Sequence, residues 1–154
     1  MDMNKEKVQQ IIGDNSRFIS PYAEPEGYYI YKDKENIVRP EEITLYFERL
    51  EYAVSHAEEL IRQAFGDGTY FYDYLFKDFD YEKEMSLYPE NARLYEEMNK
   101  IKTPEQMFQG LRFESFVLDK TNIGAYLSNP NFMFGNFIEA VWYENWNLLY
   151  SWIC

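Results

Sequence analysis

The chain has 154 residues and a formal net charge of −12, with 27 acidic against 15 basic side chains. A chain of this length fits one domain, and we expect residues 1–154 to form a single compact domain. A surface this negative repels phosphates, which argues against direct nucleic-acid binding and against anionic membrane surfaces. The partners that the charge favours are cationic: a basic protein, a cationic small molecule or a metal ion.

Aromatic residues make up 19% of the chain, and 46% of all residues are hydrophobic. Disordered chains are poor in aromatic residues, so the composition predicts a folded protein whose core consists largely of rings. The only cysteine is Cys154, which excludes an internal disulfide. There is no apolar signal sequence after the first residues and no run of 18 apolar residues. We therefore expect a cytoplasmic protein without a membrane span.

The first 40 residues predict a short helix, a loop and a hairpin, in that order. Three apolar residues follow the spacing of a helix face: Val8, Ile11 and Ile12. Gly13 ends this helix. Two prolines and a glycine favour a loop over residues 20–27. Residues 28–31 are strand-forming types, and a turn at 32–36 would return the chain onto residues 37–38 as a hairpin.

A long helix is predicted to begin at Pro40, because proline is favoured at the first helical position and two acidic residues follow it. Apolar residues then recur on one helix face: Ile43, Phe47, Leu50, Val54, Ala57, Ile61 and Ala64. The glycines at 66 and 68 end the helix. Residues 43–47 also alternate, which leaves open a strand there with a helix starting near Glu48. We favour the continuous helix.

The next segments combine one ambiguous stretch with two helices. Residues 70–81 fit a helix or an extended segment equally well. A helix is predicted over residues 89–100, opened by proline. Thr103 and Gln106 have the spacing of a capping box, with a proline at the first helical position, and predict a short helix that ends at Gly110.

The last third of the sequence is predicted to contain one strand and one helix. Residues 112–118 indicate a strand, and the Asn129–Pro130 pair indicates a loop. Residues 131–154 carry all three tryptophans and an apolar stripe with helical spacing: Phe134, Ile138, Val141, Trp142, Leu149 and Trp152. We therefore predict a C-terminal helix. The fold class is α+β, a mostly helical domain with a small antiparallel β element.

Few residues of the sequence suggest catalysis. His56 is the only histidine, so a site with several histidine ligands is excluded, and Cys154 has no base held beside it. Acidic residues alternate from Asp78, as in a calcium loop. Lys83 and Pro89 occupy the positions that need glycine and glutamate, so the pattern fails. We expect no catalytic residues, no metal, no cofactor and no enzymatic activity.

The segment from Asp67 to Glu97 is the strongest functional signal. It has nine acidic and three basic side chains, a local charge of −6. Tyrosine rings beside carboxylates suit the binding of arginine and lysine side chains. The predicted partner-binding residues are Asp67, Tyr70, Tyr72, Asp73, Tyr74, Asp78, Asp80 and Tyr81. The alternative is that residues 71–79 supply core phenylalanines, half-buried tyrosines pack on them, and the acids only keep the surface soluble.

These observations favour an acidic, non-catalytic protein-binding domain. The leading hypothesis is a stoichiometric inhibitor of a basic partner, such as a toxin immunity protein or a phage-type antagonist of a nucleic-acid-handling enzyme. One alternative is a small enzyme or ligand-binding domain with an aromatic pocket formed by Phe134, Trp142 and Trp146. Another is a structural adaptor in a larger assembly. Exposed aromatic residues would also suit a homodimer.

Overall fold

The computed structural model describes residues 3–13, 17–20, 40–118 and 122–154. The predicted loop at 20–27, beyond its first residue, and the predicted hairpin at 28–38 lie outside the described residues. Within them the chain forms seven α-helices, one short 3-10 helix and a four-stranded antiparallel sheet. The α+β class is therefore confirmed, and the sheet is larger than the small β element that the sequence predicted.

The first helix, α1 (Met3–Ile12), is confirmed. Val8 and Ile12 are buried, and α1 packs against the second helix. Gly13 ends α1 with a φ of +51°, and its amide N–H donates to the carbonyl oxygen of Gln9. Glycine suits this position because a left-handed conformation costs it no steric strain.

The long predicted helix is two helices, α2 (Pro40–Ser55) and α3 (Ala57–Phe65). The strand considered for residues 43–47 is wrong, since these residues lie inside α2. The break falls at His56, whose ring nitrogen Nδ1 lies 3.0 Å from the carbonyl oxygen of Tyr52. From Phe47 onward the predicted apolar stripe is buried or partly buried in the core.

Five short helical elements follow: α4 (Thr69–Phe76), α5 (Tyr81–Leu87), the 3-10 helix η1 (Pro89–Asn91), α6 (Ala92–Asn99) and α7 (Pro104–Gln109). The ambiguous stretch is thus helical up to Phe76. The helix predicted over 89–100 begins as a 3-10 turn. The capping box is confirmed: the amide N–H of Gln106 donates to Oγ1 of Thr103, and the side chain of Gln106 accepts from the amide of Thr103, both over 3.2 Å.

The four strands are consecutive in the chain and adjacent in the sheet: β1 (Arg112–Leu118), β2 (Asn122–Ser128), β3 (Ile138–Tyr143) and β4 (Leu148–Ile153). The strand at residues 112–118 is confirmed. The helix predicted over residues 131–154 is wrong, because this segment forms β3 and β4. Val141 and Trp142, which would be neighbours on one side of a helix, point to opposite faces of the sheet.

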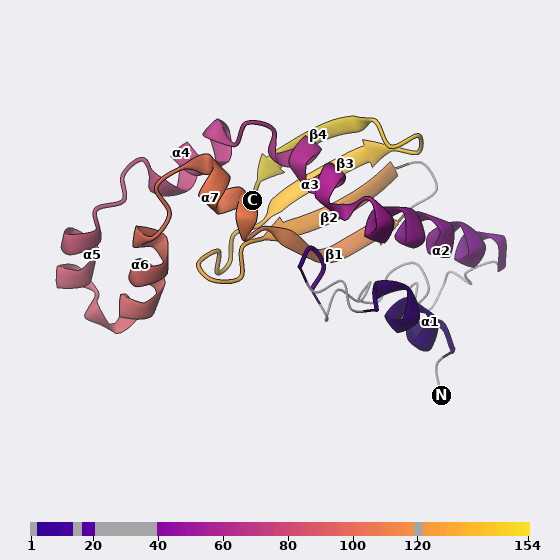
Figure 1. Cartoon of the computed structure of the whole chain (residues 1–154), viewed down its shortest axis with the longest axis horizontal. Helices are drawn as coiled ribbons and strands as arrows, with labels where there is room; N and C mark the ends of the chain where they lie inside the picture. The colour runs from indigo at the N-terminus through magenta and orange to yellow at the C-terminus, as the bar shows by residue number, and fades with distance from the viewer. Residues whose placement is uncertain (1–2, 14–16, 21–39, 119–121) are drawn as a thin grey trace.

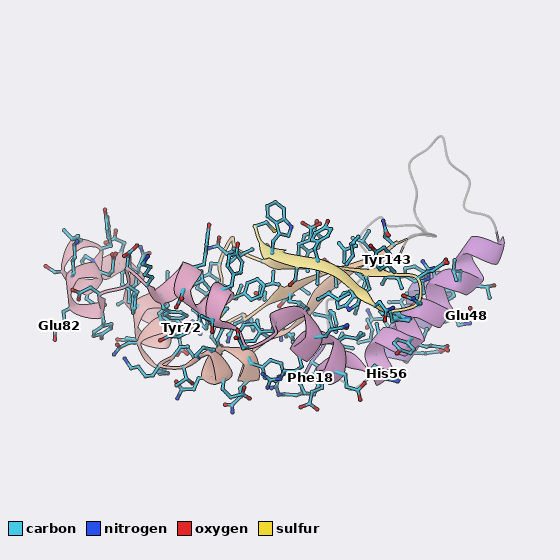
Figure 2. All side chains as sticks on the ribbon, turned by 90° about the horizontal axis from the view of Figure 1, so that it is seen from above. Phe18, Glu48, His56, Tyr72, Glu82 and Tyr143 are labelled. Atoms are coloured by element: carbon cyan, nitrogen blue, oxygen red, sulfur yellow. The ribbon has the colours of Figure 1, made fainter. Side chains whose placement is uncertain are left out.

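Helices α2 and α3 lie against one face of the sheet (Figures 1 and 2). The buried side chains on this face include Phe113, Phe116, Ile123, Leu127, Ile138 and Trp142. Two hydrogen bonds tie α3 to the sheet. The indole Nε1–H of Trp142 donates to Oε1 of Gln63 over 2.9 Å, and Oγ of Ser151 donates to the carbonyl oxygen of Ala64 over 2.7 Å.

Helices α5 and α6 project from the body of the molecule, on the side away from α2 (Figure 1). No residue of α5 is buried, and Tyr95 is the buried residue of α6. The ring of Tyr95 lies 6.2 Å from that of Phe79, in the connection that follows α4, and the ring of Phe79 lies 6.2 Å from that of Phe76 in α4. So little buried apolar area favours local opening of α5 and α6.

Candidate protein-binding surfaces

A tight turn of residues 66–68 positions α4. Gly66 and Gly68 have φ values of +63° and +78°, in the region where glycine is favoured over other residues. A carboxylate oxygen of Asp67 accepts the amide N–H of Thr69 over 2.9 Å, which fixes the start of α4. Asp67 is exposed, so its side chain combines a structural hydrogen bond with a surface charge.

The inner side of α4 is attached to the core through aromatic contacts. Phe71 stacks on Phe65 with ring centroids 5.6 Å apart, and Phe76 packs edge-on against Phe132 at 5.5 Å. Tyr72 belongs to this side, because it is partly buried and stacks on Phe76 at 4.9 Å. For Tyr72 the structure therefore matches the alternative expectation of a half-buried packing tyrosine.

The outer side of α4 carries three of the predicted partner-binding residues together. Tyr70, Asp73 and Tyr74 follow the i, i+3, i+4 spacing of one helix face, and all three are exposed, with exposed fractions of 56% for Tyr70 and 61% for Tyr74. We call these three residues the α4 face. It presents two rings and one carboxylate on a helix whose opposite side is anchored in the core.

The other predicted residues lie beyond α4 and have different surroundings. Asp78 is exposed in the connection between α4 and α5. Asp80 caps α5, since its Oδ1 accepts the amide N–H of Lys83 over 3.2 Å. Tyr81 is partly buried at the first position of α5. The structure thus groups the α4 face and distributes the remaining predicted residues over turns, a helix cap and partly buried positions.

A second aromatic surface lies on the side of the sheet opposite α2 and α3. It was not among the surfaces predicted from the sequence. Tyr143, Tyr150 and Trp152 are each exposed by 46% to 49% and point to this side. We call these three residues the sheet face. The helix that the spacing predicts over residues 131–154 would not place these three rings on one surface, whereas strands β3 and β4 do. The alternation of residues 138, 140 and 142 is the signal that could have revealed the strand.

The carboxylate of Glu139 lies on the same side of the sheet as these rings. Glu139 is opposite Trp152 of β4 and Tyr126 of β2 in the strand pairing. The indole Nε1–H of Trp152 donates to Oε2 of Glu139 over 2.6 Å. Burial raises the pKa of Tyr126, and the charge of Glu139 raises it further. Burial also raises the pKa of the Cys154 thiol, again with a contribution from Glu139. Cys154 is therefore a neutral thiol at neutral pH and a poor nucleophile. This surface suits apolar contact better than charge attraction.

The single histidine is held by its neighbours. The ring of His56 stacks on Tyr52 with centroids 4.0 Å apart, and its Nδ1 lies 3.0 Å from Oγ of Ser55. In the described parts of the chain, no three histidine, cysteine or acidic side chains are grouped so that they could hold a metal ion.

The three rings of the suggested aromatic pocket occupy separate places. Phe134 is exposed in the loop between β2 and β3, Trp142 is buried in the core, and Trp146 lies in the turn between β3 and β4. This turn and the loop of Phe134 lie at opposite ends of β3. Phe134 therefore does not share a pocket with the two tryptophans, which have their ring centroids 6.1 Å apart.

Comparisons of this chain with protein-family models, with curated proteins and with solved structures gave no match. A search of the described helices for a bilayer-spanning segment also found none with the necessary length and apolar character.

Proposed function

We propose that this chain is an acidic, non-catalytic protein-binding domain that acts as a stoichiometric inhibitor of a basic protein. A toxin or a nucleic-acid-handling enzyme with a cationic cleft is the kind of partner that its charge suits. The observation that carries the proposal is the α4 face, where Tyr70, Asp73 and Tyr74 are exposed side by side within the most acidic segment of the sequence.

The chemistry of the α4 face supports this role. Tyrosine contributes a large rigid contact area at interfaces, while its hydroxyl group keeps a hydrogen bond. A carboxylate between two rings binds arginine through charge-assisted hydrogen bonds, and the rings accept the guanidinium plane by stacking. Because the inner side of α4 is packed on Phe65 and Phe132, the backbone that carries these groups loses little conformational freedom when a partner binds.

The test begins with affinity purification from the native cell and identification of the bound protein by mass spectrometry. Binding of that purified protein is then compared between wild type and the double variant Tyr70→Ala/Tyr74→Ala. A loss of at least about 2 kcal/mol, or thirtyfold in Kd, is expected for central interface tyrosines. Tyr88→Ala is the matched control, since Tyr88 is 49% exposed but lies outside the α4 face.

Charge is tested separately from the rings. Asp73→Lys is expected to slow association with the basic partner, and the effect should shrink as salt is added. Asp80 is unsuitable for charge reversal, because its carboxylate caps α5. Unchanged affinity in both Asp73→Lys and the tyrosine double variant would reject the α4 face as the docking surface. An acidic or uncharged partner would reject the proposed class of target.

A further inference from the structure

An open pocket of about 360 Å³ lies between α2 and the turn that joins β3 to β4. It is lined by Leu45, Glu48, Arg49, Tyr52, Glu144 and Trp146. Glu48 lies midway along α2, far from Tyr72 and α4 (Figure 2). This pocket is therefore a different place from the α4 face.

Aromatic rings form one wall of the pocket. Trp146 stacks on Tyr52 with ring centroids 4.5 Å apart and an interplanar angle of 23°, and Tyr52 stacks in turn on His56. Both faces of the Tyr52 ring are thus covered. Trp146 is partly buried and lines the pocket, so its indole is the ring that a bound group can contact.

The backbone at Trp146 is unusual. Its φ of +66° lies in the left-handed region, which an aromatic residue adopts at a free-energy cost. Asparagine or glycine would satisfy such a turn without that cost. An indole is held there beside the pocket, in contact with Tyr52. Strain of this kind is typical of residues at functional sites.

The charges of the pocket favour a cation. Glu48 and Glu144 are exposed carboxylates, and within the described part of the chain neither takes part in an ion pair. Arg49 is 6% exposed and is already engaged within the protein. The two carboxylates therefore outnumber the one guanidinium, and they flank a wall of rings.

We propose that this pocket binds the guanidinium group of an arginine side chain from a partner protein. Guanidinium is planar and weakly hydrated, stacks on aromatic faces and pairs with carboxylates, so it matches this lining better than an ammonium group does. A partner side chain is favoured over a free small molecule, since the pocket is open and would leave a free ligand largely exposed. The inference shares with the proposed function a basic partner but not the site.

The test uses the blocked tripeptide acetyl-Gly-Arg-Gly-amide and follows the indole N–H resonance of Trp146 by NMR. Trp146→Phe assigns the resonance. A saturable shift is expected at millimolar concentrations. The same tripeptide with citrulline, a neutral isostere of arginine, is expected to leave the resonance in place. The lysine tripeptide is expected to bind more weakly than the arginine tripeptide.

Two carboxylate variants separate the pocket from general charge. Glu48→Gln/Glu144→Gln is expected to weaken binding at least about fivefold. Glu58→Gln/Glu59→Gln removes the same charge from exposed positions of α3 and is expected to change binding less than twofold. Circular dichroism checks that both variants keep the fold.

Three results would overturn the inference: no saturable shift up to about 10 mM tripeptide, an equal shift with citrulline, or equal weakening in the two carboxylate variants. Tighter binding of free arginine than of the tripeptide would show a small-molecule site instead. All of these are measured without the partner of the α4 face. A failure here therefore leaves the proposed function standing, and the reverse also holds.

Discussion

Replacing Gly68 by alanine should destabilise the protein more than the same change at Gly135. The two glycines have nearly equal φ values, +78° and +80°. A left-handed conformation costs a non-glycine residue about 1–2 kcal/mol, and this cost applies at both positions. The difference lies in the space around the new methyl group. A Cβ atom at Gly68 would overlap the ring of Phe65, whereas one at Gly135 would meet no atom within 4 Å.

The ring of Phe65 cannot move aside easily. It is 3% exposed, stacks on Phe71 and lies 6.0 Å from the ring of Phe108. Overpacking of such a site adds about 1–3 kcal/mol. We therefore expect Gly68→Ala to lower the free energy of unfolding by about 2–5 kcal/mol, and Gly135→Ala by about 1–2 kcal/mol.

Urea unfolding measures both variants, with tryptophan fluorescence as the probe. Equal slopes with different midpoints would show that stability alone has changed. Because Gly68 also sets where α4 begins, its variant should weaken partner binding through the α4 face, while the Gly135 variant should not. Equal losses of stability in the two variants would refute the close packing of Phe65 against this turn.

Three further outcomes are expected. Asp80→Ala should destabilise α5 by about 1 kcal/mol, seen as faster amide hydrogen exchange, and Asp80→Asn should retain most of the cap. A hydrogen bond from Arg62 lowers the pKa of Glu105, so this pair stabilises the fold above the ordinary glutamate pKa, and that contribution is lost as pH falls through the lowered pKa. Arg62→Gln should raise the Glu105 pKa in an NMR titration. Trp142→Phe should cost about 2–3 kcal/mol in urea unfolding, and Gln63→Ala about 1 kcal/mol or less.

Several helix starts and ends were predictable because their chemistry is local. A proline at position 40 and the Thr103–Gln106 capping box act within one helical turn, and the structure contains both helix starts. Gly13 ends α1 for the same kind of reason. The break at His56 was not predictable, because the apolar stripe continues through it from α2 into α3.

The sheet was only partly predictable. Residues 138–153 fit a helical stripe as well as two strands, and short apolar segments cannot be assigned from periodicity alone. Pairing with β2 decides the matter: Ile138 lies opposite Leu127 and Trp142 opposite Ile123, so both are buried beneath the helices. The same pairing turns Val141 to the other side. Such contacts depend on residues distant in the sequence.

The candidate binding residues show the same division. The density of tyrosines and acids between Asp67 and Glu97 was visible in the sequence. Which of them are exposed was not, because Tyr72 and Tyr74 differ by only two positions and yet lie on opposite sides of α4. The contacts of Phe76 with Phe132 fix the rotation of the helix and so select the outer residues.

By itself the amino-acid sequence determined the acidic character, the α+β class and several helix ends, since composition and capping need no distant partner. Only the tertiary structure decided the strands β3 and β4, the sheet face and the contact between Tyr52 and Trp146. Those features arise from side chains that are far apart in the chain. Their energies become favourable only when the whole core has assembled.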